Sequence, residues 1–155
     1  MSAWDSTGLS PEDQPRFEYV NRDQVPEELK EVFDSIVDSQ RGVGTLSNGA
    51  LPGPFNGWMY TDPEMARALD GIGMAVRSNT TNVPKTMKEV AICVIGAHFR
   101  SNVEFWAHSR IALAAGVRQE VLDSIYNSEK PSFSDDGEEP FQKAAYDMVV
   151  EYLDG

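Results

Sequence analysis

The sequence predicts an all-α fold. In most of the chain, apolar residues recur every three or four positions, which is the spacing of one face of a helix. Prolines precede several of these segments and glycines follow them, as expected where helices begin and end. No segment shows the sustained alternation of apolar and polar residues that would indicate a strand. We expect one helical domain over residues 17–155, because a chain of this length can bury a core of its own.

The first helix is predicted from Pro26 to Gly42. Residues 1–16 contain Pro11 and Pro15 among polar residues, and we expect them to form a flexible arm. Pro26 and two glutamates begin the helix, whose apolar residues follow one face: Leu29, Val32, Phe33, Ile36 and Val37.

The next segment, residues 43–57, is rich in glycine and proline, so we expect a loop that is able to cover a pocket. A short helical segment is predicted to carry Phe55, Trp58, Met59 and Tyr60. Asp62-Pro63 then opens a second clear helix, which continues through Arg77 and is followed by a loop over residues 78–83.

Four further helices are predicted in the C-terminal half. Pro84 begins the first, Arg100 to Asn102 interrupt it, and the second runs over residues 102–115 until Gly116 ends it. A short helix follows over residues 117–126. A polar, acidic loop over residues 128–140 then leads to a last helix over residues 141–153.

The charge and the cysteine content exclude several classes of function. The formal net charge is −12 and is spread along the chain, so we expect no nucleic-acid partner and no docking to anionic membranes. No segment reaches the roughly 18 to 20 apolar residues of a membrane span, and the N-terminus lacks the features of a secretory signal. The single cysteine, Cys93, cannot form a disulfide within the chain. We therefore expect a cytoplasmic protein.

The candidate functional residues lie between Glu89 and Gly116, a stretch that contains both histidines of the chain. Glu89 interrupts an apolar run over residues 90–95, and a buried carboxylate needs a partner because its charge is costly to desolvate. Glu104 and His108 are four residues apart on one predicted helix, so their side chains can touch.

Such a pair suits two different chemistries. A carboxylate beside an imidazole fixes the tautomer of the ring and raises its basicity, which favours proton transfer near neutral pH. Glu104 and His108 are also possible metal ligands, with His98 or Glu89 as a third. Because the chain has only two histidines, a complete metal site is the less favoured of the two, although carboxylates are able to supply the remaining ligands.

Each candidate residue also has a structural interpretation. Ser101 and Glu104 match a capping box at the start of a helix. His98 lies nine residues after Glu89, on the opposite face of a straight helix, where a satisfied core or interface histidine is the alternative to substrate binding. Trp58 and Trp106 suit stacking on a flat substrate, although aromatic residues at helical spacing usually belong to the core. Cys93 is not expected to be a nucleophile, because burial and a nearby acid raise the pKa of a thiol.

The stretch from Lys88-Glu89 to Glu104-Phe105-Trp106-Ala107-His108, with the segment Ile111 to Val117 after it, resembles the carboxymuconolactone decarboxylase and AhpD-like superfamily. The resemblance covers residues 26 to about 127. The redox branch of this superfamily carries a Cys-x-x-Cys pair, a histidine four residues later and a glutamate upstream. The matching positions here are Ser101, Glu104, His108 and Glu89. Because both thiols are absent, we do not expect a thiol peroxidase.

The resemblance implies an AhpD-like subunit of about six to seven helices that assembles into a homotrimer or homohexamer. It also implies a cofactor-independent lyase or isomerase of the decarboxylase type, acting on a small carboxylated or enolisable ring compound. His108 is then the general acid or base, Glu104 orients it, and Glu89 is a second proton carrier. His98, Ser101, Trp58 and Trp106 are the expected substrate-binding residues. The apolar helix that usually follows in this family is not found before Gly155.

Two other functions stay open on the sequence. One is a non-catalytic helical subunit that serves assembly or ligand binding. The other is a metal-dependent hydrolase or lyase that uses Glu104, His108 and one more ligand.

Overall fold

The structure, a computed structural model, describes residues 17–38, 44–79 and 82–155. In these residues it contains seven α-helices, one π-helical turn and no strand, so the predicted all-α class is confirmed for this part of the chain. An isolated bridge joins Asn21 and Ala50. The predicted arm over residues 1–16 lies outside the described residues, and the single domain over residues 17–155 stays a prediction.

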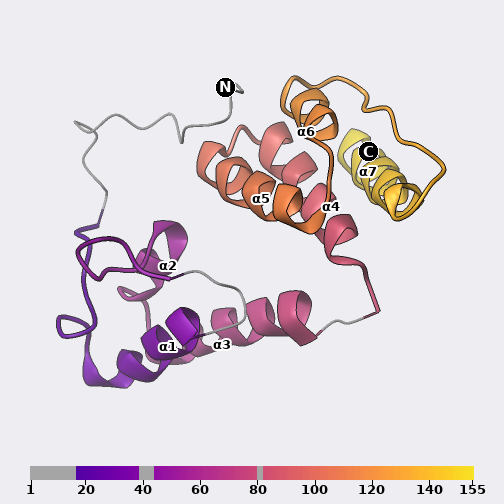
Figure 1. Cartoon of the computed structure of the whole chain (residues 1–155). Coiled ribbons are helices and arrows are strands. Elements are labelled where there is room, and N and C mark those ends of the chain that lie inside the picture. The colour runs from indigo at the N-terminus through magenta and orange to yellow at the C-terminus, as the bar shows by residue number, and fades with distance from the viewer. Residues whose placement is uncertain (1–16, 39–43, 80–81) are drawn as a thin grey trace. The chain divides into compact units, whose positions relative to one another are not determined.

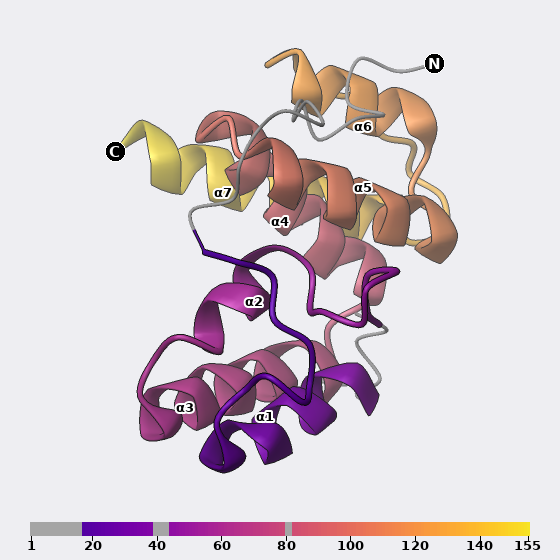
Figure 2. The same ribbon diagram turned by 90° about the vertical axis from the view of Figure 1, so that its left-hand side faces the viewer.

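The described residues form two compact units, one within residues 17–79 and one from Asn82 to Gly155 (Figure 1). The N-terminal unit contains α1 (Glu27–Asp38), α2 (Gly53–Trp58), α3 (Pro63–Met74) and the π-helical turn η1 (Ala75–Asn79). Helices α1 and α3 lie side by side in both views (Figures 1 and 2). Their packing buries an apolar core: Val25, Leu29, Val32, Phe33, Ile36, Leu51, Met59 and Ala66.

Two boundaries in the N-terminal unit differ from the prediction. Helix α2 begins at Gly53, inside the segment expected to be a loop, because Pro54 occupies its first turn, where proline favours a helix. The helix predicted to reach Arg77 leaves α-helical geometry after Met74 and continues as the π-helical turn. Its start is as predicted, since the Asp62 side chain accepts a hydrogen bond from the Glu64 amide at 2.9 Å.

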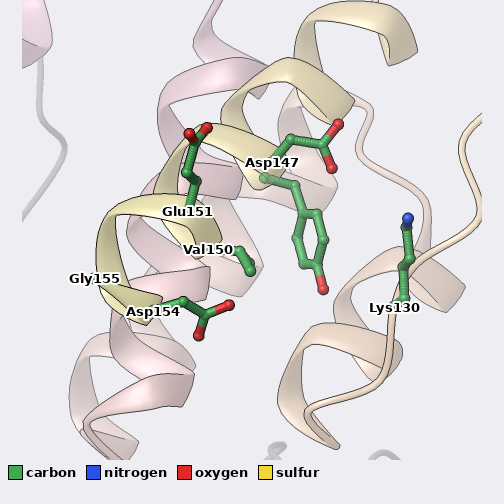
Figure 3. Close-up of a pocket in the computed structure, with 7 residues that line it drawn as sticks. Lys130, Asp147, Val150, Glu151, Asp154 and Gly155 are labelled. Carbon is green, nitrogen blue, oxygen red and sulfur yellow. The ribbon is translucent and has the colours of Figure 1, made fainter.

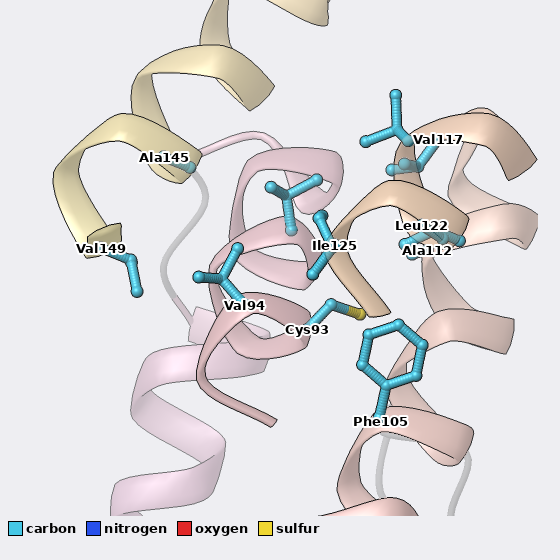
Figure 4. Packing of buried hydrophobic residues seen from close by; sticks show 11 residues of the cluster. Cys93, Val94, Phe105, Ala112, Val117, Leu122, Ile125, Ala145 and Val149 are labelled. Carbon is cyan, nitrogen blue, oxygen red and sulfur yellow. The ribbon is translucent and has the colours of Figure 1, made fainter. Parts of the chain in front are cut away.

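The C-terminal unit contains α4 (Lys85–His98), α5 (Asn102–Ala115), α6 (Gln119–Tyr126) and α7 (Glu139–Asp154). Helix α4 is central and packs against the other three. Their shared core is apolar (Figure 4): Val90, Cys93, Val94, Phe105, Ala112, Val117, Val121, Leu122, Ile125, Ala145 and Val149. Helix α7 begins two residues before the predicted Phe141, because Pro140 lies in its first turn and so favours the helix.

Helices α4, α5 and α6 end in the same way, with a residue in the left-handed conformation. Gly116 closes α5 with a φ of 106°, as its position in the sequence predicted. Arg100 after α4 and Ser128 after α6 adopt φ values of 52° and 59°, although neither is a glycine. After α4, the Ser101 amide donates to the Gly96 carbonyl at 2.8 Å and the Arg100 amide to the Ala97 carbonyl at 3.0 Å. These two bonds form a Schellman motif, which turns the chain from α4 into α5.

Helices α4 and α5 approach closely at Gly96. A Cβ atom added to Gly96 would lie 3.3 Å from the Phe105 backbone nitrogen, so only glycine fits this approach without a shift. The short connection and the close approach bring polar side chains of the two helices within bonding distance.

None of the helices in the described residues is both long and apolar enough to cross a bilayer.

Candidate functional site

Glu89 and His108 meet inside the C-terminal unit. Glu89 lies on α4 and is 2% exposed, and His108 lies on α5 and is 7% exposed. The Glu89 Oε2 atom is 2.7 Å from the Nδ1 atom of His108. In the tautomer that satisfies the buried carboxylate, Nδ1 carries the proton and donates it to Glu89. The buried carboxylate singled out in the sequence therefore has an imidazole as its partner.

The other ring nitrogen of His108 faces a second carboxylate. His108 Nε2 lies 3.2 Å from the Oε1 atom of Glu104, which is one turn earlier on α5. The Glu104 side chain is 43% exposed, so this end of the arrangement is open to solvent. The imidazole thus bridges a buried carboxylate and a solvent-facing one. We call this arrangement the Glu89–His108–Glu104 line.

The capping box expected as an alternative for Glu104 is not formed. Ser101 is the N-cap of α5, but its side chain makes no capping hydrogen bond. The Ser101 amide, which Glu104 would have bonded, donates instead to Gly96. The Schellman motif therefore occupies the group on which the capping box depends, and Glu104 faces His108.

Two of the predicted substrate-binding residues lie on other faces of their helices. His98 is the last residue of α4 and is exposed, with its ring packed edge-on against Phe99 at 4.8 Å. Trp106 comes two residues before His108 and so projects from the far side of α5, where the Arg110 guanidinium lies 4.3 Å from its ring centre. Neither residue joins the Glu89–His108–Glu104 line.

Trp58 belongs to the N-terminal unit. Its ring packs edge-on against Phe55 at 4.9 Å and borders the apolar core of that unit. This is the core placement that the sequence analysis gave as the alternative to substrate binding.

Cys93 is fully buried and points toward the Phe105 ring (Figure 4). Burial raises the pKa of this thiol, and the charges of Glu89 and Glu104 raise it further. Both effects disfavour the thiolate, which is the reactive form of a cysteine.

The arrangement of these side chains does not favour the binding of a metal ion. Within the part of the chain that the structure describes, no group of three or more histidine, cysteine, aspartate or glutamate residues is arranged to hold a metal ion. The geometry explains why, because Glu89 and Glu104 contact different nitrogens of the same ring. A single ion bound at either nitrogen would have only one of the two carboxylates beside it.

Four hollows bounded by described residues are lined by other side chains. The largest of them, about 500 Å³, lies beside α7 and is lined by Tyr146, Asp147 and Glu151 among others (Figure 3). The one signal for these residues in the sequence is the acidic spacing on α7, where Asp147, Glu151 and Asp154 recur at helical intervals.

Comparisons with protein families, curated proteins and solved structures give no match to this chain. The resemblance to the AhpD-like superfamily therefore depends on the residues between Lys88 and Val117 quoted above. A proposal for the function of the chain therefore rests on the geometry of the Glu89–His108–Glu104 line.

Proposed function

We propose that the protein is a cofactor-independent lyase or isomerase that moves a proton through His108. One observation carries the proposal: the His108 ring is held at Nδ1 by a carboxylate that is 2% exposed, while Nε2 points toward the half-exposed Glu104. An imidazole anchored at one nitrogen and directed outward at the other is the arrangement of an oriented general base.

We assign the two glutamates the opposite roles to those expected from the sequence. Glu89 holds Nδ1–H and stabilises the imidazolium that forms when Nε2 takes a proton, so Glu89 is the positioning residue. Glu104 lies beside the reactive nitrogen and has access to water. It can pass protons between Nε2 and solvent, so that in an isomerisation a proton is returned to another carbon of the product, and in a decarboxylation a proton is supplied to the carbon that loses CO₂.

We place the approach of the substrate to Nε2 on the Glu104 side, because the Glu104 side chain is 43% exposed and is the solvent-facing end of the line. A single oriented base suits the removal of a proton from a carbon next to a carbonyl group. The resemblance to the decarboxylase branch supports a small carboxylated or enolisable ring compound as the substrate class.

A non-catalytic role is the second candidate, and one observation favours it. His108 is 7% exposed and has a carboxylate at each ring nitrogen, which also describes a purely structural link between α4 and α5. The two candidates differ in what happens at Nε2, because only catalysis requires that nitrogen to exchange protons with a substrate.

The deciding experiment replaces His108 by asparagine. The Asn amide can still donate to Glu89 from the position of Nδ1, but it has no counterpart of Nε2. The purified full-length chain is offered lactones and β-keto acids, and both CO₂ release and deuterium incorporation from D₂O are measured. We expect wild-type turnover and a loss of about 10²- to 10⁴-fold in His108→Asn.

A matched control removes a carboxylate elsewhere in the same unit. Glu120→Gln changes an exposed residue of α6 and should leave turnover unchanged, whereas Glu89→Gln and Glu104→Gln should each reduce it. If the wild-type chain neither releases CO₂ nor exchanges deuterium on any of these compounds, or if His108→Asn keeps full turnover, the structural link is favoured instead.

We extend the proposal to a homotrimer or homohexamer, as the resemblance suggests. Large apolar side chains on the outer face of α7 support it, because Phe141, Met148 and Tyr152 are 52%, 58% and 84% exposed. Light scattering on the purified chain measures its mass directly, and a monomer at micromolar concentration would contradict the assembly.

A further inference from the structure

A second feature of the C-terminal unit is a groove beside α7 that the proposed proton transfer does not use. It consists of two adjoining hollows of about 210 and 500 Å³, which share Tyr146, Val150 and Asp154. Neither hollow includes a residue of the Glu89–His108–Glu104 line. We call the two hollows together the α7 groove.

The inner hollow of the α7 groove has an apolar floor. Helices α4, α6 and α7 supply it, together with the ring of Tyr146: Val94, Ala97, Ile125, Val150 and Leu153. Burying an apolar side chain on this floor is favourable by roughly 25 cal/mol for each Å² removed from water. The groove is therefore able to hold apolar side chains of a partner.

Two helix ends add negative charge to the α7 groove. The inner hollow is lined by His98 at the end of α4 and by Ile125 in the last turn of α6. The C-terminus of a helix carries a partial negative charge, which attracts cations. The last turn of α6 contains no basic residue that would offset this charge, and the last turn of α4 contains His98.

Carboxylates add to the negative charge around the groove. Glu129, Asp147, Glu151 and Asp154 line its two hollows, with Lys130 as the lysine on its opposite wall (Figure 3). Asp147 is also paired with Lys143. Burial raises the pKa of the Tyr146 hydroxyl, and the charges of Asp147 and Asp154 raise it further.

We propose that the α7 groove docks a basic amphipathic peptide segment of a partner protein. Apolar side chains of the segment lie on the floor, and its lysines or arginines meet the carboxylates and helix ends around it. The length of the groove fits a peptide better than a single small molecule. Its lining follows α7 from Tyr146 to Gly155, a span of roughly 13 Å at 1.5 Å per residue, which matches about two turns of a partner helix.

The probe is a fluorescein-labelled peptide of leucine and lysine, KLLKKLLKKLLK, whose leucines lie on one face when it is helical. Binding to the full-length chain is measured by fluorescence anisotropy at physiological ionic strength. One control peptide has serine in place of leucine, and another has glutamate in place of lysine. We expect saturable binding of the leucine-lysine peptide and at least about tenfold weaker binding of both controls, which corresponds to about 1.4 kcal/mol.

Matched double variants separate the groove from the general acidity of the chain. Glu129→Gln with Asp154→Asn removes two charges from the groove, while Asp23→Asn with Glu64→Gln removes two exposed charges from the N-terminal unit. Both pairs raise the formal net charge from −12 by two. We expect the groove pair to weaken binding by about tenfold and the distant pair to change it less than about twofold.

Three results would overturn the proposal. The first is no binding of the leucine-lysine peptide, and the second is equal weakening by the two double variants, which would indicate attraction to net charge alone. The third is equally tight binding of the serine-lysine peptide, since the apolar floor would then contribute nothing. Circular dichroism of each variant checks that the fold is retained.

Discussion

Glu89 and His108 are separated by 19 residues in the sequence and by 2.7 Å between Oε2 and Nδ1. This bond joins α4 to α5 in the interior of the C-terminal unit, where a carboxylate without a partner is costly. Removing either partner should therefore affect stability as well as the proposed proton transfer.

We predict that His108→Ala lowers the free energy of unfolding by roughly 3 to 5 kcal/mol, because it leaves Glu89 buried without its imidazole. His108→Asn should cost much less, since its amide keeps a donor at the Nδ1 position. Urea unfolding followed by circular dichroism measures both. Equal stability of the two variants would show that the bond to Glu89 contributes little.

The approach of α4 to α5 at Gly96 gives a second prediction. Gly96→Val should destabilise the unit by about 2 kcal/mol, because a Cβ alone already lies 3.3 Å from the Phe105 nitrogen and the branched side chain adds two more carbons. Gly71→Ala is the contrasting control, since Gly71 lies within α3 with open space around it. That substitution should stabilise the protein by about 0.5 to 1 kcal/mol through helix propensity. Thermal unfolding compares the two variants.

Arg100 gives a third prediction, because it is an exposed non-glycine residue at a φ of 52°. Arg100→Gly should stabilise the protein by up to about 1 kcal/mol, since glycine adopts this left-handed conformation without a steric cost. Arg100→Ala keeps the Cβ atom and should give no such gain. A stabilisation of the same size in both variants would show that the arginine side chain, rather than the backbone conformation, is unfavourable at this position.

The fourth prediction concerns the stability of the protein at acidic pH. Hydrogen bonds from Arg118 and from the Ser134 amide lower the pKa of Glu139 from its usual 4.5 to about 2. Its contribution to stability is therefore complete above about pH 4.5 and is lost as the pH falls toward 2. The Arg118 side chain is nearly half exposed, so solvent screening limits the contribution to roughly 1 kcal/mol. Urea unfolding at pH 7 and pH 3 should show a smaller loss for Glu139→Gln than for the wild-type chain.

The sequence predicted helices better than it predicted their boundaries. Apolar spacing and the prolines at positions 26, 63 and 84 located α1, α3 and α4 correctly. The start of α2 could not be recognised in the glycine- and proline-rich segment over residues 43–57, because the same residues that favour loops also fit the first turn of a helix. The left-handed residues after α4 and α6 are Arg100 and Ser128, whose identities give no signal for that conformation.

Those contacts of the candidate site that depend on the periodicity of a single helix could be predicted from the sequence. The i to i+4 spacing brought Glu104 to His108, and the nine-residue interval placed His98 away from Glu89. The contact between Glu89 and His108 depends on how two helices cross, and a single sequence does not specify that crossing. For this reason the sequence indicated that the buried carboxylate needs a partner but did not identify that partner as His108.

Because Cys93 is fully buried, the reactivity of the chain's only thiol reports on local opening of the C-terminal unit. A reagent that modifies thiols reaches the sulfur only during a fluctuation that parts the helices around it. The modification rate therefore reads out the free energy of that fluctuation, without any label being introduced. Comparing this rate between wild type and the His108 variants would show how firmly the Glu89 contact keeps the unit closed.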